Sequence, residues 1–236
     1  MRKRIMYGLI AVLVAGIIFG VLFYLDKKEK SKDSYKFKVE YESLNGETSQ
    51  SGKKYRTLNI SKDNRIKYST AKEIYEKMNK NETFIVYFGF AKCPWCRSMV
   101  ENLLDLADKN QVDIYYVDVY DIRDVKEAKD GKVIETKKGD KYYLKLLTKM
   151  DNVLSDYVLE TENKNELHTG EKRIYAPNVV TVVQGHAEKM VEGISKDLKD
   201  PYGKITDKMK KDSIGELKCI FKCLEKASVC TKPSSC

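Results

Sequence analysis

The chain has 236 residues, 42% hydrophobic and 33% charged, a balance typical of soluble proteins once the apolar N-terminus is set aside. A chain of this length holds one anchor and one domain with a sizeable core, rather than two full domains. The net charge of +9 is spread over Lys-rich segments that also carry Glu and Asp, and no block of like charge is interleaved with aromatic residues. Nucleic acid is therefore not an expected partner.

The N-terminus has the pattern of a membrane anchor. Residues 5–25 carry no charge, and a helix of that length spans the hydrocarbon core of about 30 Å. We expect residues 1–4 to be a short cytoplasmic N-terminus and 5–25 to be an uncleaved, single-pass transmembrane helix. A cleaved signal peptide is the alternative, but the run is longer than an h-region and ends in Phe23-Tyr24-Leu25 instead of small residues.

Cations flank this apolar run on both sides, so the cysteines decide its orientation. Arg2, Lys3 and Arg4 favour a cytoplasmic N-terminus, although further lysines follow the run. Six cysteines, four of them within residues 219–236, suit an oxidising compartment. We therefore expect a protein of the cell membrane whose C-terminal domain is extracytoplasmic.

Four segments are predicted after the anchor. Residues 26–54 are polar and are expected to be a tether or irregular lead-in with one short strand at 37–41. An α/β domain is expected at 55–228, followed by a Cys-containing tail at 229–236.

The elements of this domain follow from hydrophobic periodicity and turn residues. In chain order they are short β-prone pieces at 55–60 and 66–68, a helix at 70–79, a strand at 84–88, a helix to 109, a strand at 112–119, an amphipathic helix at 141–159, a strand at 179–183 with a hairpin partner at 188–191, and a last helix at 206–227. Thr70 and Glu73 are spaced as a capping box. The strand at 84–88 is apolar at every position, which predicts burial on both faces.

Residues 121–174 are expected to be an insertion. The pieces at 130–142 and 157–174 predict two added hairpins around the amphipathic helix. Two interpretations are equally supported, a substrate-shaping cap near the functional site and a lengthened region of surface decoration.

The motif Cys93-Pro94-Trp95-Cys96 follows the buried strand directly and opens the next helix. Cys93 is therefore expected at the N-cap, where free N–H groups and the helix dipole lower the pKa of its thiol, with Lys92 and Arg97 adding positive charge. A thiolate is the attacking species in disulfide exchange, so Cys93 is predicted to be an exposed nucleophile. Cys96 shares a helix face with buried positions and is expected to be a shielded thiol that resolves the mixed disulfide.

A Cys-x-x-Cys motif is also half of a zinc site. Zinc would need a second pair of ligands, and His168 and His186 each stand alone in polar contexts. We therefore expect redox chemistry at Cys93 and Cys96, with no metal and no cofactor.

The segment TFIVYFGFAKCPWCRSMV at residues 83–100 resembles the strand, active-site loop and helix of the thioredoxin superfamily. The likeness covers about 66–195 and implies a thioredoxin-like fold, a central mixed β-sheet flanked by helices. Ala176-Pro177 resembles the cis-proline loop of that family, which implies that Pro177 packs by the active site and Ala176 contacts the substrate chain. An ordinary trans proline is the alternative.

The chain as a whole resembles anchored thioredoxin-like proteins of Gram-positive bacteria, some of which are described as bacteriocin-transport accessory proteins. Two departures leave the reduction potential open. Thioredoxins carry a buried Asp on the strand before the motif, where this chain has Tyr87. The Pro-Trp pair between the cysteines is closer to glutaredoxins than to thioredoxins.

Four cysteines lie near the C-terminus. Ile214, Leu217, Phe221 and Leu224 predict the inward stripe of the last helix, which places Cys219 and Cys223 on its outer face. Nested structural disulfides, Cys223–Cys230 and Cys219–Cys236, are one of three possible pairings. A second redox pair and a metal site are the alternatives.

These patterns predict a membrane-anchored thiol-disulfide oxidoreductase that acts on protein thiols and disulfides with a separate redox partner. Trp95 is expected beside Cys93 as a contact surface, with simple packing on the loop as the alternative. Two other functions remain open. One is an accessory protein for export of a secreted peptide, with a non-catalytic thioredoxin fold. The other is a surface domain with a static Cys93–Cys96 bridge.

Overall fold

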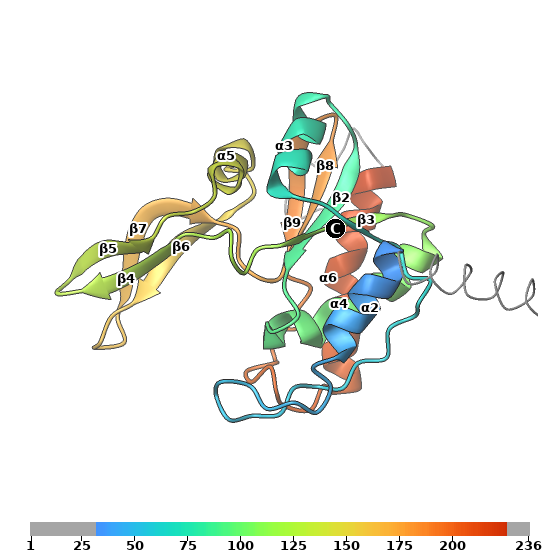
Figure 1. Ribbon diagram of the computed structural model, residues 1–236, viewed down its shortest axis with the longest axis horizontal. Helices are drawn as coiled ribbons and strands as arrows, with labels where there is room; N and C mark the ends of the chain where they lie inside the picture. Colours follow the sequence, from blue (N-terminus) through green and yellow to red (C-terminus); the bar gives the residue numbers. More distant parts are fainter. Residues whose placement is uncertain (1–31, 226–236) are drawn as a thin grey trace, which may run out of the picture.

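The computed structural model describes residues 32–225, which form a mixed α/β arrangement (Figure 1). Its helices are α2 (Asp33–Glu42), α3 (Ala71–Asn79), α4 (Pro94–Lys109), α5 (Lys141–Lys149) and α6 (Asp207–Glu225). Its strands are β1 (Ile66–Tyr68), β2 (Phe84–Gly89), β3 (Ile114–Asp118), β4 (Val125–Lys129), β5 (Lys132–Lys137), β6 (Ser155–Glu160), β7 (Glu166–Arg173), β8 (Asn178–Val183) and β9 (His186–Val191).

A five-stranded mixed sheet forms the centre, in the order β1-β3-β2-β8-β9. β2 runs parallel to β3 and antiparallel to β8, so Ile85 lies between Ile114 and Thr181. β1 pairs in parallel with β3, and β9 pairs antiparallel with β8. All six residues of β2 are buried, which confirms the predicted interior strand.

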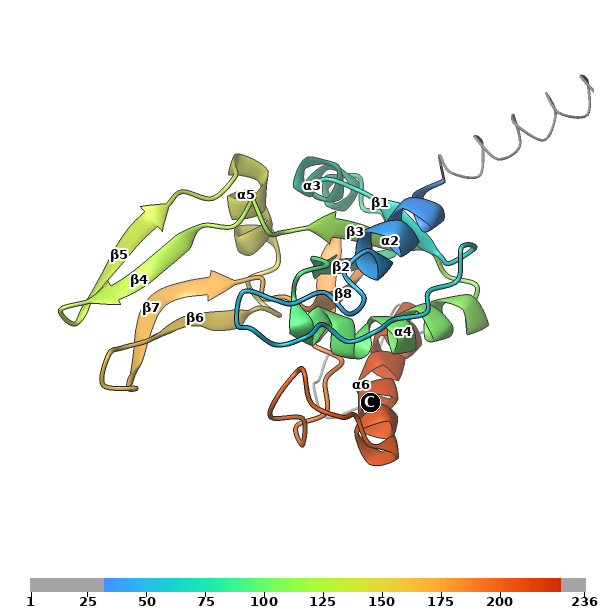
Figure 2. The same ribbon diagram turned by 60° about the horizontal axis from the view of Figure 1, so that its bottom comes forward.

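Helices cover both faces of the central sheet (Figures 1 and 2). Alternate residues of a strand point to opposite faces, so Ile85 and Tyr87 pack with α2, α4 and α6. Val86 and Phe88 pack on the other side, with α3 and α5. The two layers of side chains enclose the strand from which the Cys-Pro-Trp-Cys motif emerges.

Strong local signals placed several elements correctly. Thr70 accepts from the backbone N–H of Glu73, whose side chain accepts from the Thr70 N–H, which confirms the predicted capping box of α3. The helix after the motif ends at Lys109 as predicted. β8, the turn at Gly185 and β9 also confirm the predicted hairpin.

The lead-in contains a helix instead of the predicted strand at 37–41. Phe37 and Tyr41 lie one helical turn apart in α2 and are both fully buried. A strand would also have turned Val39 inward, but Val39 is 48% exposed. Part of the segment expected to be a tether is therefore packed on the sheet.

The β-prone piece at 55–60 is not a strand. The side chain of Asn45 accepts from the Leu58 N–H and donates to the Leu58 carbonyl, each within 2.9 Å. These two bonds replace the strand partner that the backbone would otherwise need. Leu58 and Ile60 are buried from this irregular segment.

The segment predicted as an insertion forms α5 and two hairpins, β4–β5 and β6–β7. α5 ends at Lys149, so the prediction of a helix to residue 159 is wrong. Leu154 precedes β6 and Tyr157 lies within it, although both are buried as the apolar pattern requires. The two hairpins lie side by side and extend away from the sheet (Figures 1 and 2).

Within residues 32–225, no helix combines the length and apolar character needed to cross a membrane. The expected anchor at 5–25, the residues 1–4 before it and the tail at 229–236 lie outside the described residues.

Candidate functional site

β2 and α4 place the two cysteines of the motif together. Cys93 is the N-cap of α4 and Pro94 lies in its first turn, as predicted. The backbone N–H of Cys96 donates to the Cys93 Sγ over 3.2 Å. Cys93 and Cys96 are free thiols and are not joined as a disulfide. The Cys96 N–H can therefore stabilise negative charge on the Cys93 sulfur.

The pKa values of the two thiols are shifted in opposite directions. A hydrogen bond from the Cys96 thiol is the largest influence lowering the pKa of Cys93, and the N–H groups of Cys96 and Trp95 lower it further against burial. Burial raises the pKa of Cys96 well above its ordinary range, and the neighbouring Cys93 adds to this. Cys93 is therefore the thiol that ionises first.

Both sulfurs are covered, which corrects the expectation of an exposed Cys93. Cys93 is 4% exposed and Cys96 is fully buried with Val100, Leu103 and Ala107. The Cys93 thiol donates to the backbone carbonyl of Ala176 over 3.3 Å. A substrate sulfur that reaches Cys93 would therefore displace the contact with Ala176.

The Ala176-Pro177 peptide is cis, as expected from the sequence. It lies just before β8, where Asn178 holds the loop. The Asn178 Oδ1 accepts from the Tyr175 N–H over 2.8 Å, and its Nδ2 donates to the Pro177 carbonyl over 2.9 Å. Asn178 is buried, so these bonds fix the loop beside Cys93.

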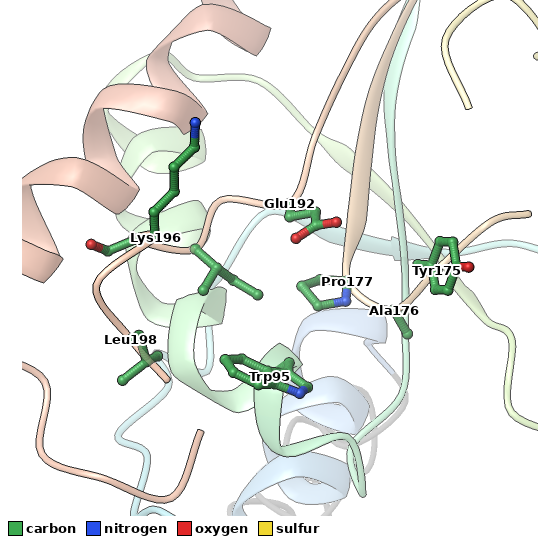
Figure 3. A pocket seen from close by; sticks show the side chains of 9 residues that line it. Trp95, Tyr175, Ala176, Pro177, Glu192, Lys196 and Leu198 are labelled. Carbon is green, nitrogen blue, oxygen red and sulfur yellow. The ribbon is translucent and has the colours of Figure 1, made fainter. Parts of the chain in front are cut away.

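A groove of about 330 Å³ lies beside the motif (Figure 3). It is lined by Trp95, Tyr175, Ala176, Pro177, Glu192, Ile194, Ser195, Lys196 and Leu198. The Trp95 indole and the Pro177 ring face the same hollow, and Trp95 is only partly buried. Trp95 and Ala176 therefore lie where they would contact a chain that approaches Cys93.

Arg123 places a positive charge near Cys93, although the sequence alone did not identify this residue. Its charge lowers the pKa of Cys93, and its guanidinium lies 5.2 Å from the centroid of the Phe90 ring. Arg123 follows β3 within the segment predicted as an insertion. No local pattern marks it, because the loop after β3 brings it to the motif only in the folded chain.

Arg97, predicted to add charge near the thiols, has a different role. It is 1% exposed, and its guanidinium donates to the backbone carbonyls of Tyr41 and Arg56 and to the Asn45 side chain. These contacts attach the lead-in to α4. Lys92 is exposed, 5.8 Å from the centroid of the Tyr120 ring.

The C-terminal cysteines are only partly described. Leu217 and Phe221 are buried as predicted, but Ile220 is also fully buried, which widens the inward face of α6. Cys223 follows Ile220 by one turn and is buried, so its predicted place on the outer face is wrong. Cys219 is partly buried. Cys230 and Cys236 lie outside the described residues, and the pairing remains a prediction.

Metal ligands do not gather in the part of the chain that the structure describes, where no group of three or more His, Cys, Asp or Glu could hold an ion. His168 and His186 are both exposed, in agreement with their polar sequence context.

No protein-family model, curated protein or solved structure matches this chain. The chemistry open to the site therefore follows from two hydrogen-bonded thiols of unequal acidity beside a groove. That arrangement suits thiol-disulfide exchange.

Proposed function

We propose that the protein is a membrane-anchored, extracytoplasmic thiol-disulfide oxidoreductase of the thioredoxin type. The observation that carries this proposal is the placement of two adjoining thiols: Cys93 caps α4 and accepts from the Cys96 N–H, whereas Cys96 is fully buried. These surroundings shift the pKa of Cys93 downward and the pKa of Cys96 upward. A structural cysteine pair needs no such difference, whereas an exchange enzyme needs one thiol that attacks the substrate and a second that later resolves the mixed disulfide.

The arrangement of the sheet supports the thioredoxin likeness. β1, β3 and β2 run parallel to one another, β8 runs antiparallel to β2, and β9 runs antiparallel to β8. The motif lies at the end of the interior strand β2, and the cis peptide at Ala176-Pro177 precedes its neighbour β8. Helices on both faces complete the likeness.

In this mechanism the Cys93 thiolate attacks one sulfur of a substrate disulfide. A bond forms between Cys93 and that sulfur, and the other substrate sulfur leaves as a thiolate that takes up a proton. Cys96 then attacks Cys93, so the Cys93–Cys96 disulfide forms and the reduced substrate leaves. Each step is reversible, so the same site can oxidise a protein dithiol when it starts as the disulfide.

The groove supports proteins as substrates. Trp95, Pro177, Ile194 and Leu198 offer apolar surface, and the Ala176 carbonyl is available once Cys93 is engaged. Because Ala176 lines the groove and its carbonyl accepts from the Cys93 thiol, an extended chain in the groove would place its cysteine beside Cys93. A separate redox partner would restore the starting state of the pair.

Trapping tests the proposal. The full-length Cys96→Ala variant, expressed in its own cells, should accumulate reducible mixed disulfides through Cys93. A Cys93→Ala/Cys96→Ala chain is the matched control, because it keeps the C-terminal cysteines. Absence of Cys93-dependent adducts while the wild type cycles would overturn the mechanism. Full cellular function of a Cys93→Ser/Cys96→Ser chain would instead favour the accessory role.

A redox titration separates exchange from a static bridge. We expect the Cys93–Cys96 pair to have a potential above about −300 mV, because structural disulfides lie below that value. A lower potential would favour a structural bond.

A further inference from the structure

A pair of tyrosine hydroxyls is buried in the same core as the Cys96 thiol. The hydroxyl oxygens of Tyr41 and Tyr87 are 2.8 Å apart. The Tyr87 hydroxyl acts as a hydrogen-bonding neighbour that lowers the pKa of the Cys96 thiol, against the larger effect of burial. Tyr41, Tyr87 and Cys96 are all fully buried, so the two hydroxyls and the thiol are shielded from water.

The position of the Tyr87 ring depends on the glycine at position 89, which has no side chain. Tyr87 and Gly89 lie on the same face of β2, two residues apart. A Cβ at Gly89 would lie 2.3 Å from the Tyr87 hydroxyl oxygen. The phenol of Tyr87 therefore lies over Gly89, toward the end of the strand from which the motif emerges.

Tyr41 comes from α2, a separate part of the chain. Its ring packs against the rings of Phe37 and Tyr116, and Arg97 donates to its backbone carbonyl over 2.7 Å. These contacts keep the Tyr41 hydroxyl within hydrogen-bond distance of the Tyr87 hydroxyl. The helix before the first strand therefore contributes a group to the site.

The order of donors follows from the chemistry of the phenol. Each tyrosine hydroxyl has one proton to donate and can accept from a neighbour. When Tyr41 donates to Tyr87, the proton of Tyr87 is directed at the Cys96 sulfur. A hydrogen bond to an ionised acceptor is about twice as strong as a neutral one, and a buried thiolate has no water to replace it.

The geometry points to Tyr87 as the hydrogen-bond donor that stabilises the Cys96 thiolate during disulfide exchange, with Tyr41 as the positioning residue that directs it. This assignment rests on the proposed exchange at Cys93. When Cys96 resolves a mixed disulfide, its sulfur bonds to Cys93 and the bond from Cys93 to the substrate sulfur breaks. The departing substrate thiolate takes up the proton that Cys96 lost.

The same donor serves the reverse reaction. A substrate thiolate attacks Cys93 of the disulfide, and Cys96 leaves as a thiolate that accepts from Tyr87. Burial raises the pKa of both Tyr41 and Tyr87 well above the ordinary value, so both keep the protons that this role needs.

Stopped-flow kinetics separate the two thiols. The reduced full-length chain, in detergent micelles, is mixed with an aromatic disulfide whose released thiolate absorbs visible light. The first release reports attack by Cys93, and the second reports attack by Cys96. A Cys93→Ser/Cys96→Ser chain supplies the background from the C-terminal cysteines.

Tyr87→Phe and Tyr41→Phe should leave the first phase unchanged and slow the second by about three- to tenfold at neutral pH. The rate should fall by less than the fraction of ionised Cys96 falls, because the thiolate of a less acidic thiol is a better nucleophile. The pH profile of the second phase should also move to higher pH. Tyr116→Phe is the matched control, since its hydroxyl bonds Glu40 over 2.9 Å instead.

Two failures are distinguishable. A wild type that shows no second release dependent on Cys93 and Cys96 overturns the proposed function. A normal wild type with unchanged second phases in both variants overturns this inference alone. Equal slowing in Tyr116→Phe would also overturn it, because the effect would then come from loosened packing.

Discussion

The Arg97 guanidinium donates to the backbone carbonyl of Tyr41 over 2.7 Å, which joins the active-site helix to α2. The same side chain donates to the Arg56 carbonyl and to Asn45, and it lies 5.4 Å from the centroid of the Tyr55 ring. One buried cation thus gathers three parts of the lead-in around α4. The residue next to Cys96 in sequence is therefore a structural attachment for the segment that supplies Tyr41.

We predict that Arg97→Met lowers the free energy of unfolding by about 3 kcal/mol, because buried carbonyl oxygens lose their donors. Arg97→Lys should recover little of this, since one ammonium cannot reproduce the planar fork. Unfolding by urea can be followed through Trp95, the single tryptophan. Lys92→Met is the control, an exposed change expected to stay within about 0.5 kcal/mol. A loss below about 1 kcal/mol in Arg97→Met would contradict the attachment.

Arg123→Gln should raise the pKa of the Cys93 thiol. The cation stabilises the thiolate, so its removal favours the protonated form. At a pH below this pKa the thiolate fraction falls, and alkylation of Cys93 by iodoacetamide should slow by about two- to fivefold. The rate-pH profile of a Cys96→Ala background measures the shift directly.

Lys92→Gln provides the comparison for Arg123, because it removes a neighbouring but exposed cation. We expect its profile to match that of the parent chain. Identical profiles for both variants would mean that Arg123 does not act on Cys93.

Local signals predicted the parts of the fold that local chemistry determines. The reciprocal hydrogen bonds of Thr70 and Glu73 need only a spacing of three residues, so the start of α3 could be predicted from the sequence. The apolar run at 84–88 needs burial on both faces, which is available only inside the sheet. The roles of Cys93 and Cys96 could be predicted because the N-cap position of the first and the inward face of the second are both properties of one helix.

Long-range contacts account for what the sequence did not reveal. Phe37, Val39 and Tyr41 alternate as in a strand, and only the exposure of Val39 between the buried Phe37 and Tyr41 identifies a helix. Arg97 looks like a surface cation until the carbonyls of another segment surround it. Arg123 and Tyr41 reach the site from loops and helices distant in sequence, so no spacing rule could find them.

The base of the two hairpins contains a buried ion pair. The Arg173 Nη1 lies 3.3 Å from the Asp124 Oδ1, and the guanidinium lies 3.9 Å from the centroid of the Tyr157 ring. Asp124→Ala should cost about 3 kcal/mol in the free energy of unfolding, because Arg173 is left buried without its counter-charge. The repulsion between Arg173 and Arg123 adds to this cost.

Urea unfolding and hydrogen exchange of β4–β7 measure this effect. The exposed pair Lys172–Asp156 gives the contrast, since Asp156→Ala should change stability by less than about 1 kcal/mol. A double Asp124→Leu/Arg173→Met variant should recover part of the loss, as apolar replacements of buried pairs often do. Equal effects of Asp124→Ala and Asp156→Ala would argue against a special role for the buried pair.

Gly89→Ala should disturb Cys96 through Tyr87. The added Cβ would lie within 2.7 Å of three atoms of the Tyr87 phenol, so the ring must move from its place beside the thiol. Overpacking of this kind costs about 1–3 kcal/mol of stability. Because a displaced hydroxyl no longer donates to Cys96, the pKa of Cys96 should rise further. Titration of the Cys96 Cβ carbon by NMR measures that pKa.

A second substitution separates the two consequences of Gly89→Ala. Tyr87→Val removes the ring that the new Cβ meets, so the double variant should lose less stability than the sum of the losses in the two single variants. It should not regain the lower pKa of Cys96, because valine has no hydroxyl to donate. A sub-additive loss of stability together with recovery of the Cys96 pKa would show that Tyr87 acts through packing, and that its hydroxyl has no part in stabilising the Cys96 thiolate.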